Sequence, residues 1–110
     1  MEVVSFQMAD STTQEEALGG IRSLDGFYRE KLGYRGMQAA RSEDGTWILV
    51  LNWDCVESER KASAAMMASE KTVGFKRSVI PQTVTKKIYT LEMASTFDHP
   101  GRSVSCQGAT

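Results

Sequence analysis

The segment WILVLNW, residues 47–53, is the feature that most limits how this chain can fold. Alternate side chains of an extended strand point to opposite faces of a sheet. Here both faces are apolar, whereas a half-exposed strand would alternate apolar with polar residues. One face carries Trp47, Leu49, Leu51 and Trp53, and the other carries Ile48 and Val50. Such a strand is typical of the centre of a sheet that is covered on both sides.

Further strands and helices are predicted around this central strand. The strands are expected at 3–9, 34–41 and 83–92, and the helices at 12–32 and 54–69. This order, β-α-β-β-α-β, is that of the ferredoxin-like plan. We therefore expect an α+β fold with one four-stranded antiparallel sheet and helices on one of its faces.

The first predicted helix has a clear start and a clear apolar face. Thr12 with Glu15, or Thr13 with Glu16, can form a reciprocal capping box. Apolar residues then recur at helical spacing. They are Leu18, Ile21, Leu24, Tyr28 and Leu32.

Gly19 and Gly20 lie inside this helix, where each glycine costs about 1 kcal/mol relative to alanine. Close approach of the helix backbone to the sheet would explain the pair, and a local break in the helix would explain it equally well. For the second helix, we expect Asp54 to cap the N-terminus, with Glu57 in the reciprocal position.

Composition limits the class of partner. The chain has 110 residues, 13 basic and 14 acidic side chains and a net charge of -1, with no basic stripe. We therefore expect one domain at 1–92 and no nucleic-acid partner. The polar residues 93–110 are predicted to be an ordered tail, held by this domain or by a neighbouring chain.

The sequence favours a cytoplasmic protein. It shows neither a signal peptide at its N-terminus nor an apolar run long enough to span a membrane. Its two cysteines, Cys55 and Cys106, do not make a disulfide framework, which is typical of a reducing compartment. Cys55 is expected to be a small buried residue, and His99 to lie in a surface turn.

One series of features resembles a known family. A strand that ends in Trp53–Asp54 is followed by the helical segment WDCVESERKASAAM, then by Phe75 and by VIPQTVTKKIYTLE. This series is similar to the antibiotic-biosynthesis-monooxygenase-like family of dimeric α+β barrels, over most of residues 3–92. The family resemblance implies a homodimer of two sheets packed face to face, with a small molecule bound between sheet and partner.

The haem-degrading branch of that family implies further residues, and only one of them is present. Trp53 matches its tryptophan at the end of strand three. Strand one offers Ser5 and Gln7 in place of an asparagine, and the helix over 56–69 has no histidine to bind haem iron. No GxGxxG, Walker, HExxH or GxSxG motif is present, and His99 stands alone. We expect no metal, haem or other cofactor.

Five residues are candidates for the lining of a ligand pocket: Gln7, Asn52, Trp53, Phe75 and Tyr89. Trp53 could stack on a planar substrate or anchor the core, and Asn52 could bind a substrate oxygen or the nearby backbone. Because these two residues are adjacent, they lie on opposite faces unless a bulge intervenes. Gln7 and Tyr89 could equally face solvent or an interface, and Phe75 could simply close the core.

Two hypotheses on function remain open at this point. The first is a cofactor-independent monooxygenase that acts on a small planar, aromatic or polyketide-like molecule. The second is a non-catalytic small-molecule-binding homodimer of the same fold. The sequence displays no evident general base, and the catalytic residues are therefore not assigned.

Overall fold

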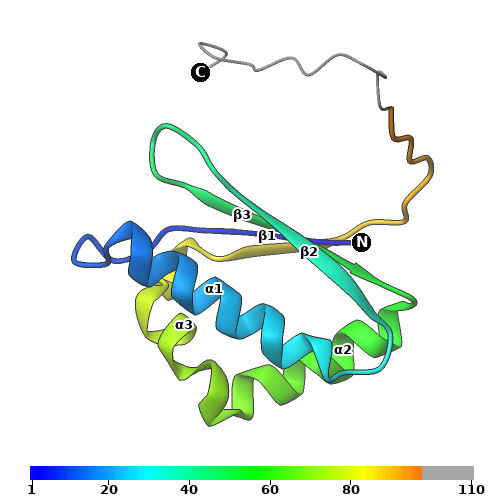
Figure 1. The fold of residues 1–110 in the computed structure, drawn as a ribbon, viewed down its shortest axis with the longest axis horizontal. Helices are drawn as coiled ribbons and strands as arrows, with labels where there is room; N and C mark the ends of the chain where they lie inside the picture. Colours follow the sequence, from blue (N-terminus) through cyan, green and yellow to red (C-terminus); the bar gives the residue numbers. More distant parts are fainter. Residues whose placement is uncertain (98–110) are drawn as a thin grey trace.

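The computed structural model describes residues 1–97, which form one four-stranded antiparallel sheet with helices on one side (Figure 1). The strand order is β2-β3-β1-β4, and each neighbouring pair is antiparallel. The strands are β1 Glu2–Phe6, β2 Tyr34–Arg41, β3 Trp47–Trp53 and β4 Thr85–Ile88. The predicted ferredoxin-like fold and the central position of the 47–53 strand are confirmed.

Three α-helices cover the same face of the sheet (Figure 1). They are α1 Gln14–Arg29, α2 Val56–Ala68 and α3 Val73–Ser78. Two short 3₁₀ turns complete the chain: η1, Glu70–Thr72, joins α2 to α3, and η2, Pro81–Thr83, precedes β4. The prediction placed β1 at 3–9 and β4 at 83–92, so both strands are shorter than expected.

Strand β1 ends early because its backbone changes partner after Phe6. The Gln7 amide donates to Thr83 Oγ1 at 2.8 Å instead of to a strand carbonyl. Met8 then makes an isolated bridge with Val79. The chain thereby leaves the sheet and turns toward α1.

The start of α1 realises one of the two predicted capping boxes. Glu16 N–H donates to Thr13 Oγ1 at 3.1 Å, and Thr13 N–H donates to Glu16 Oε1 at 3.0 Å. The prediction of Leu32 on the apolar face is wrong, because α1 ends at Arg29 and Leu32 is 88% exposed. The residues that α1 buries are Ala17, Ile21, Leu24, Phe27 and Tyr28.

Of the glycine pair only Gly20 makes a close approach among the described residues, and it approaches a helix instead of the predicted sheet. A Cβ on Gly20 would lie 3.2 Å from the Cα of Phe75, which belongs to α3 and not to the sheet. The helix continues without a break, and a Cβ on Gly19 would have no neighbour within 4 Å. Gly20 therefore allows two helices to approach, while Gly19 has no packing role.

The start of α2 differs from the prediction. Cys55 occupies the N-cap position without a side-chain capping bond, so the predicted capping box of Asp54 and Glu57 is wrong. The Asp54 amide instead donates to the Gly33 carbonyl at 2.8 Å, which ties this turn to the loop after α1. Hydrogen bonding from Ser58 lowers the pKa of Asp54. Cys55 is exposed, contrary to expectation.

Lys76 binds the C-terminal end of α2. Its ammonium donates to the carbonyls of Met66, Met67 and Ser69 at 3.0, 2.9 and 2.8 Å. A cation at a helix C-terminus satisfies free carbonyl groups and interacts favourably with the helix dipole. This contact joins α3 to the end of α2.

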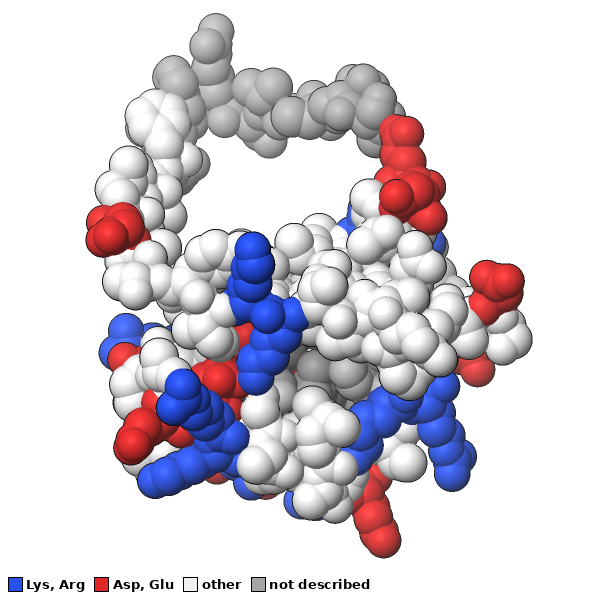
Figure 2. Space-filling model, turned by 180° about the vertical axis from the view of Figure 1, so that it is seen from behind, with Lys and Arg blue, Asp and Glu red and all other residues white. Residues whose placement is uncertain are grey.

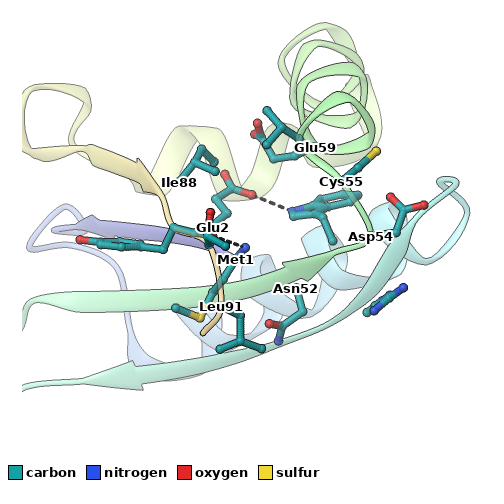
Figure 3. A pocket seen from close by; sticks show the side chains of 13 residues that line it. Met1, Glu2, Asn52, Asp54, Cys55, Glu59, Ile88 and Leu91 are labelled. Atoms are coloured by element: carbon teal, nitrogen blue, oxygen red, sulfur yellow. Dashed lines mark hydrogen bonds between the residues drawn. The ribbon is translucent and has the colours of Figure 1, made fainter. Parts of the chain in front are cut away.

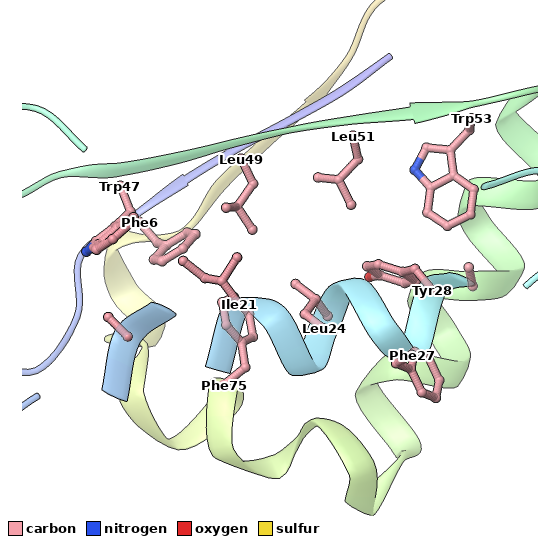
Figure 4. Packing of buried hydrophobic residues seen from close by; sticks show 12 residues of the cluster. Phe6, Ile21, Leu24, Phe27, Tyr28, Trp47, Leu49, Leu51, Trp53 and Phe75 are labelled. Atoms are coloured by element: carbon pink, nitrogen blue, oxygen red, sulfur yellow. The ribbon is translucent and has the colours of Figure 1, made fainter. Parts of the chain in front are cut away.

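The core lies between the sheet and this helical layer (Figure 4). From β3, Trp47, Leu49, Leu51 and Trp53 all point to the helices and are at most 8% exposed. On the other face Ile48 is 38% exposed and Val50 is partly buried. The single chain thus covers one apolar face of β3 and leaves the other open.

Charged side chains of both signs lie next to one another on the described surface seen in Figure 2. Among the described residues, no helix has the length and hydropathy that crossing a membrane requires.

The two glycines of α1 provide a matched pair for measuring the close approach of α1 and α3. We expect Gly19→Ala to raise the free energy of unfolding by about 1 kcal/mol, because alanine is the better helix former and space is open. Gly20→Ala should lose this gain, because its methyl group would press on the Phe75 backbone. Urea denaturation of both variants checks this, and equal gains would contradict it.

Candidate functional site

A cavity of about 480 Å³ lies between the sheet and the helices, and we call it the inner cavity. Its walls are mostly apolar and come from every layer of the fold. Residues that line it include Val4, Leu51, Met66, Phe75, Val79 and Val84. Small-molecule sites are typically concave, apolar and supplied with a few polar groups. The inner cavity has this character, since Glu2, Ser63 and Lys86 also line it.

Glu2, Glu59 and Lys86 form an ion cluster at one wall of this cavity. Lys86 Nζ makes a close ion pair with Glu59 Oε2 and lies 3.6 Å from Glu2 Oε2. The two glutamate side chains are only 4% and 3% exposed, whereas that of Lys86 is 38% exposed. Ser63 Oγ donates to Glu59 Oε2 at 2.8 Å and lies 3.1 Å from Lys86 Nζ.

Trp53 supplies the remaining hydrogen bond of the cluster. Its Nε1–H donates to Glu2 Oε1 at 2.9 Å. The indole packs edge-on against Tyr28, with ring centroids 5.1 Å apart, and lies equally close to Tyr34. The tryptophan at the end of β3 is therefore both a core residue and the partner of a buried carboxylate.

The sheet register explains why these side chains meet. Glu2 pairs directly with Leu51 on β3 and with Ile88 on β4. Trp53 and Lys86 each lie two residues from those partners, so they share the face of Glu2 and are its diagonal neighbours. Glu59 reaches the same point from α2.

Burial is the largest influence on Glu2 and raises the pKa of its carboxyl group. The hydrogen bond from Trp53 and the charge of Lys86 oppose this rise, and the charge of Glu59 adds to it. Burial likewise raises the pKa of Tyr28, which lines the inner cavity. Glu2 is thus a carboxyl group that holds a proton more readily than an exposed glutamate does.

A second cavity of about 580 Å³, the edge cavity, opens at the edge of the sheet where β1 begins and where β3 and β4 end (Figure 3). It contains three of the predicted site residues, Asn52, Trp53 and Tyr89. Asn52 and Leu91 lie on one side of the sheet, opposite Glu2, Ile88 and Glu59. A register shift in β2 between Tyr34 and Gly36 lies across from Trp53 and Asn52.

The other two predicted residues lie elsewhere. Phe75 lines the inner cavity from α3, and its ring meets Phe6 edge-on at 5.4 Å. Gln7 is exposed at the opposite end of β1 and lines neither cavity. The expected ligand space was on the open face of the sheet, whereas the inner cavity is on the face that the helices cover. It exists because α2 and α3 do not fill the space above β1 and β4.

Sequence reasoning missed the ion cluster, although part of its signal was present. Glu2 is in phase with Val4 and Phe6, so its carboxylate falls on the apolar face of β1. A charged residue in phase with core residues is an indication of a buried, paired charge. Lys86 alternates with the apolar residues Val84 and Ile88, but these are 42% and 41% exposed, so its phase does not indicate a core position. No sequence pattern indicated Glu59.

Among residues 1–97, no three His, Cys, Asp or Glu side chains gather as ligands for a metal ion. His99 and Cys106 lie outside the described residues, as does the tail from residue 98 onward.

Comparisons with known proteins find similarity in structure. Protein-family models and curated proteins give no match to the sequence. A variant of SnoaB, a cofactor-independent oxygenase from Streptomyces nogalater, is 14% identical, covers 84% of this chain and 92% of its own, and has a TM-score of 0.68. Rv0793 from Mycobacterium tuberculosis is 13% identical, with coverages of 86% and 96% and a TM-score of 0.63.

A third solved structure comes from Bordetella bronchiseptica and is provisionally described as an antibiotic biosynthesis monooxygenase. It is 15% identical, with coverages of 82% and 95% and a TM-score of 0.62. At these identities the similarity shows the fold alone. The chain has the protomer fold of the antibiotic-biosynthesis-monooxygenase-like α+β barrels, as its sequence features predicted.

The raised pKa of Glu2 gives a prediction on stability. Between the pKa of the unfolded chain, near 4.5, and the higher pKa of the folded protein, the folded state binds more protons. The contribution of Glu2 to stability therefore falls as pH rises through this window. We expect the stability of Glu2→Gln relative to wild type to be greater at about pH 8 than at about pH 4.

Urea denaturation at both pH values measures this difference. Glu15→Gln, on the exposed side of α1, is the matched control for the chemical change. A relative stability of Glu2→Gln that stays constant or falls with pH would show that burial does not dominate at Glu2.

Proposed function

We propose that this protein is a cofactor-independent monooxygenase-like enzyme that acts on a small planar, aromatic or polyketide-like molecule. The observation that carries the proposal is the inner cavity, an apolar space of about 480 Å³ with one ionic wall. A volume in this range suits a drug-sized ligand. The fold is also that of SnoaB, a protein described as a cofactor-independent oxygenase.

An apolar cavity suits oxygen chemistry that the substrate itself carries out. A substrate that loses a proton to become a carbanion can reduce oxygen directly, and the protein then has to exclude water and stabilise the anion. The buried wall of the inner cavity supplies such groups. A metal, haem or flavin has no part in the proposed reaction.

We further propose a homodimer that buries the open face of the sheet. Val3, Ile48 and Val50 lie on this face, which would leave apolar surface in water. The two-fold pairing of identical surfaces is the commonest way to cover such a face. Residues 90–97 leave the sheet as a segment without helix or strand, in which Leu91 and Met93 are 54% and 77% exposed (Figure 1). In the proposed dimer this segment contacts the partner.

A cytoplasmic location stays a prediction. The alternative function, ligand binding without turnover, is an outcome of the first experiment below.

Oxygen uptake with anthrone as the test compound checks the enzymatic proposal. We expect uptake above the buffer rate that a chelator does not reduce and that added haem or flavin does not increase. Val84→Trp should abolish it, because the indole would fill the inner cavity. Val73→Trp is the matched control, since both valines are 42% exposed and Val73 does not line this cavity. Anthrone binding without uptake would favour the non-catalytic alternative.

Charges placed on adjacent residues of β3 check the dimer. Leu51 is 1% exposed in the core, so Leu51→Lys should unfold the domain. Val50 lies on the open face, so Val50→Lys should leave the circular dichroism spectrum native and convert the dimer to a monomer. Light scattering measures the mass, and a wild type that is monomeric at micromolar concentration would refute the dimer.

A further inference from the structure

We propose that Glu2 is the catalytic base of the inner cavity, which accepts a proton from a carbon acid bound there, and that Lys86 stabilises the oxygen anion so formed. The inference rests on the proposed function, because it concerns the same cavity and the same class of planar molecule. It adds the residues that carry the first chemical step and the substrate property on which they act.

Position selects Glu2 from the charged residues of the site. It lines both the inner cavity and the edge cavity, although only 4% of its side chain is exposed. Trp53 Nε1–H donates a hydrogen bond to Glu2 Oε1 at 2.9 Å and thereby orients the carboxyl group. Among residues 1–97, Oε2 has only the looser contact with Lys86 at 3.6 Å, so this oxygen is the one that can take up a proton.

Glu59 has a different task. Its Oε2 accepts from Ser63 and makes the close ion pair with Lys86, and it does not line the inner cavity. Protonation of Glu59 would break that ion pair, whereas protonation of Glu2 Oε2 would leave it in place. Glu59 is therefore a positioning residue that holds the Lys86 ammonium at the wall of the cavity.

The environment gives Glu2 the basicity that this step needs. Burial raises the pKa of Glu2, which brings it closer to that of a weakly acidic C–H group than an exposed glutamate would be. General base catalysis is most efficient when the pKa of the base lies near the operating pH, and a raised pKa moves a glutamate in that direction. The apolar walls also strengthen the attraction between Lys86 and a developing anion.

The proposed step balances within the site. The C–H bond next to a ketone breaks, its electron pair moves into the carbonyl system as an enolate, and the proton forms an O–H bond with Glu2 Oε2. Lys86 remains protonated and faces the enolate oxygen. No oxidant takes part in this step. The later reaction of the carbanion with oxygen belongs to the proposed function and not to this inference.

Hydrogen exchange without oxygen tests the step by itself. Anthrone is incubated with protein in deuterated buffer under argon, and deuterium at its methylene carbon is measured by mass spectrometry. We expect exchange to be faster with wild-type protein than in buffer alone. In Glu2→Gln, the part of the rate that the protein adds should fall about 10²-fold or more. Gln retains an acceptor for Trp53 but cannot take up the proton. Lys86→Met should also slow exchange.

Matched controls separate this role from a general effect of charge removal. Glu15→Gln and Lys61→Met change exposed residues of α1 and α2 and should exchange as wild type does. If Glu2→Gln does not fold, Glu2→Asp decides, because it keeps the charge and withdraws the carboxylate from the cavity. Its exchange should be slower than that of wild type.

The outcomes distinguish the two proposals. Equal exchange by wild type and the folded Glu2 variant, or wild-type exchange no faster than buffer, overturns the assignment of Glu2 whether or not oxygen is consumed. Exchange that depends on Glu2, without oxygen uptake in air, supports the assignment while the monooxygenase proposal fails. Exchange and uptake that both depend on Glu2 support both.

Discussion

The burial of Glu2 is the constraint on which the rest of the site depends. A carboxylate removed from water costs free energy unless partners compensate for the lost hydration. The compensation here comes from both neighbouring strands, as Trp53 on β3 donates to one oxygen and Lys86 on β4 faces the other. Lys86 in turn needs Glu59, so α2 is tied to the sheet through the same charges.

The helical layer is arranged so that this wall remains beside open space. Gly20 lets α1 pack directly on α3, and Lys76 ties α3 to the end of α2. Because these helices pack against each other, they leave the inner cavity open between themselves and strands β1 and β4. An unfilled apolar space forfeits dispersion contacts, and a ligand of matching shape would restore them.

Prediction from the sequence succeeded where local pattern decides the structure. The central position of the 47–53 strand follows from two apolar faces, and the Thr13–Glu16 box follows from capping chemistry at fixed spacing. It failed where contacts distant in sequence decide. Leu32 matches the helical period, yet the helix ends at Arg29. Asp54 matches a capping pattern, yet its amide is bound to Gly33.

The candidate site divides in the same way. The sequence by itself determined the order of the elements, the two apolar faces of β3, and the phase that places Glu2 on the face of Val4 and Phe6, because side-chain direction alternates along a strand. Only the tertiary structure decided that Glu2 and Lys86 meet and that a cavity lies beside them. It also decided that Glu59, which follows Glu2 by 57 residues, joins them from α2. Strand register and helix spacing set those distances, and both arise from packing between segments that no local pattern relates.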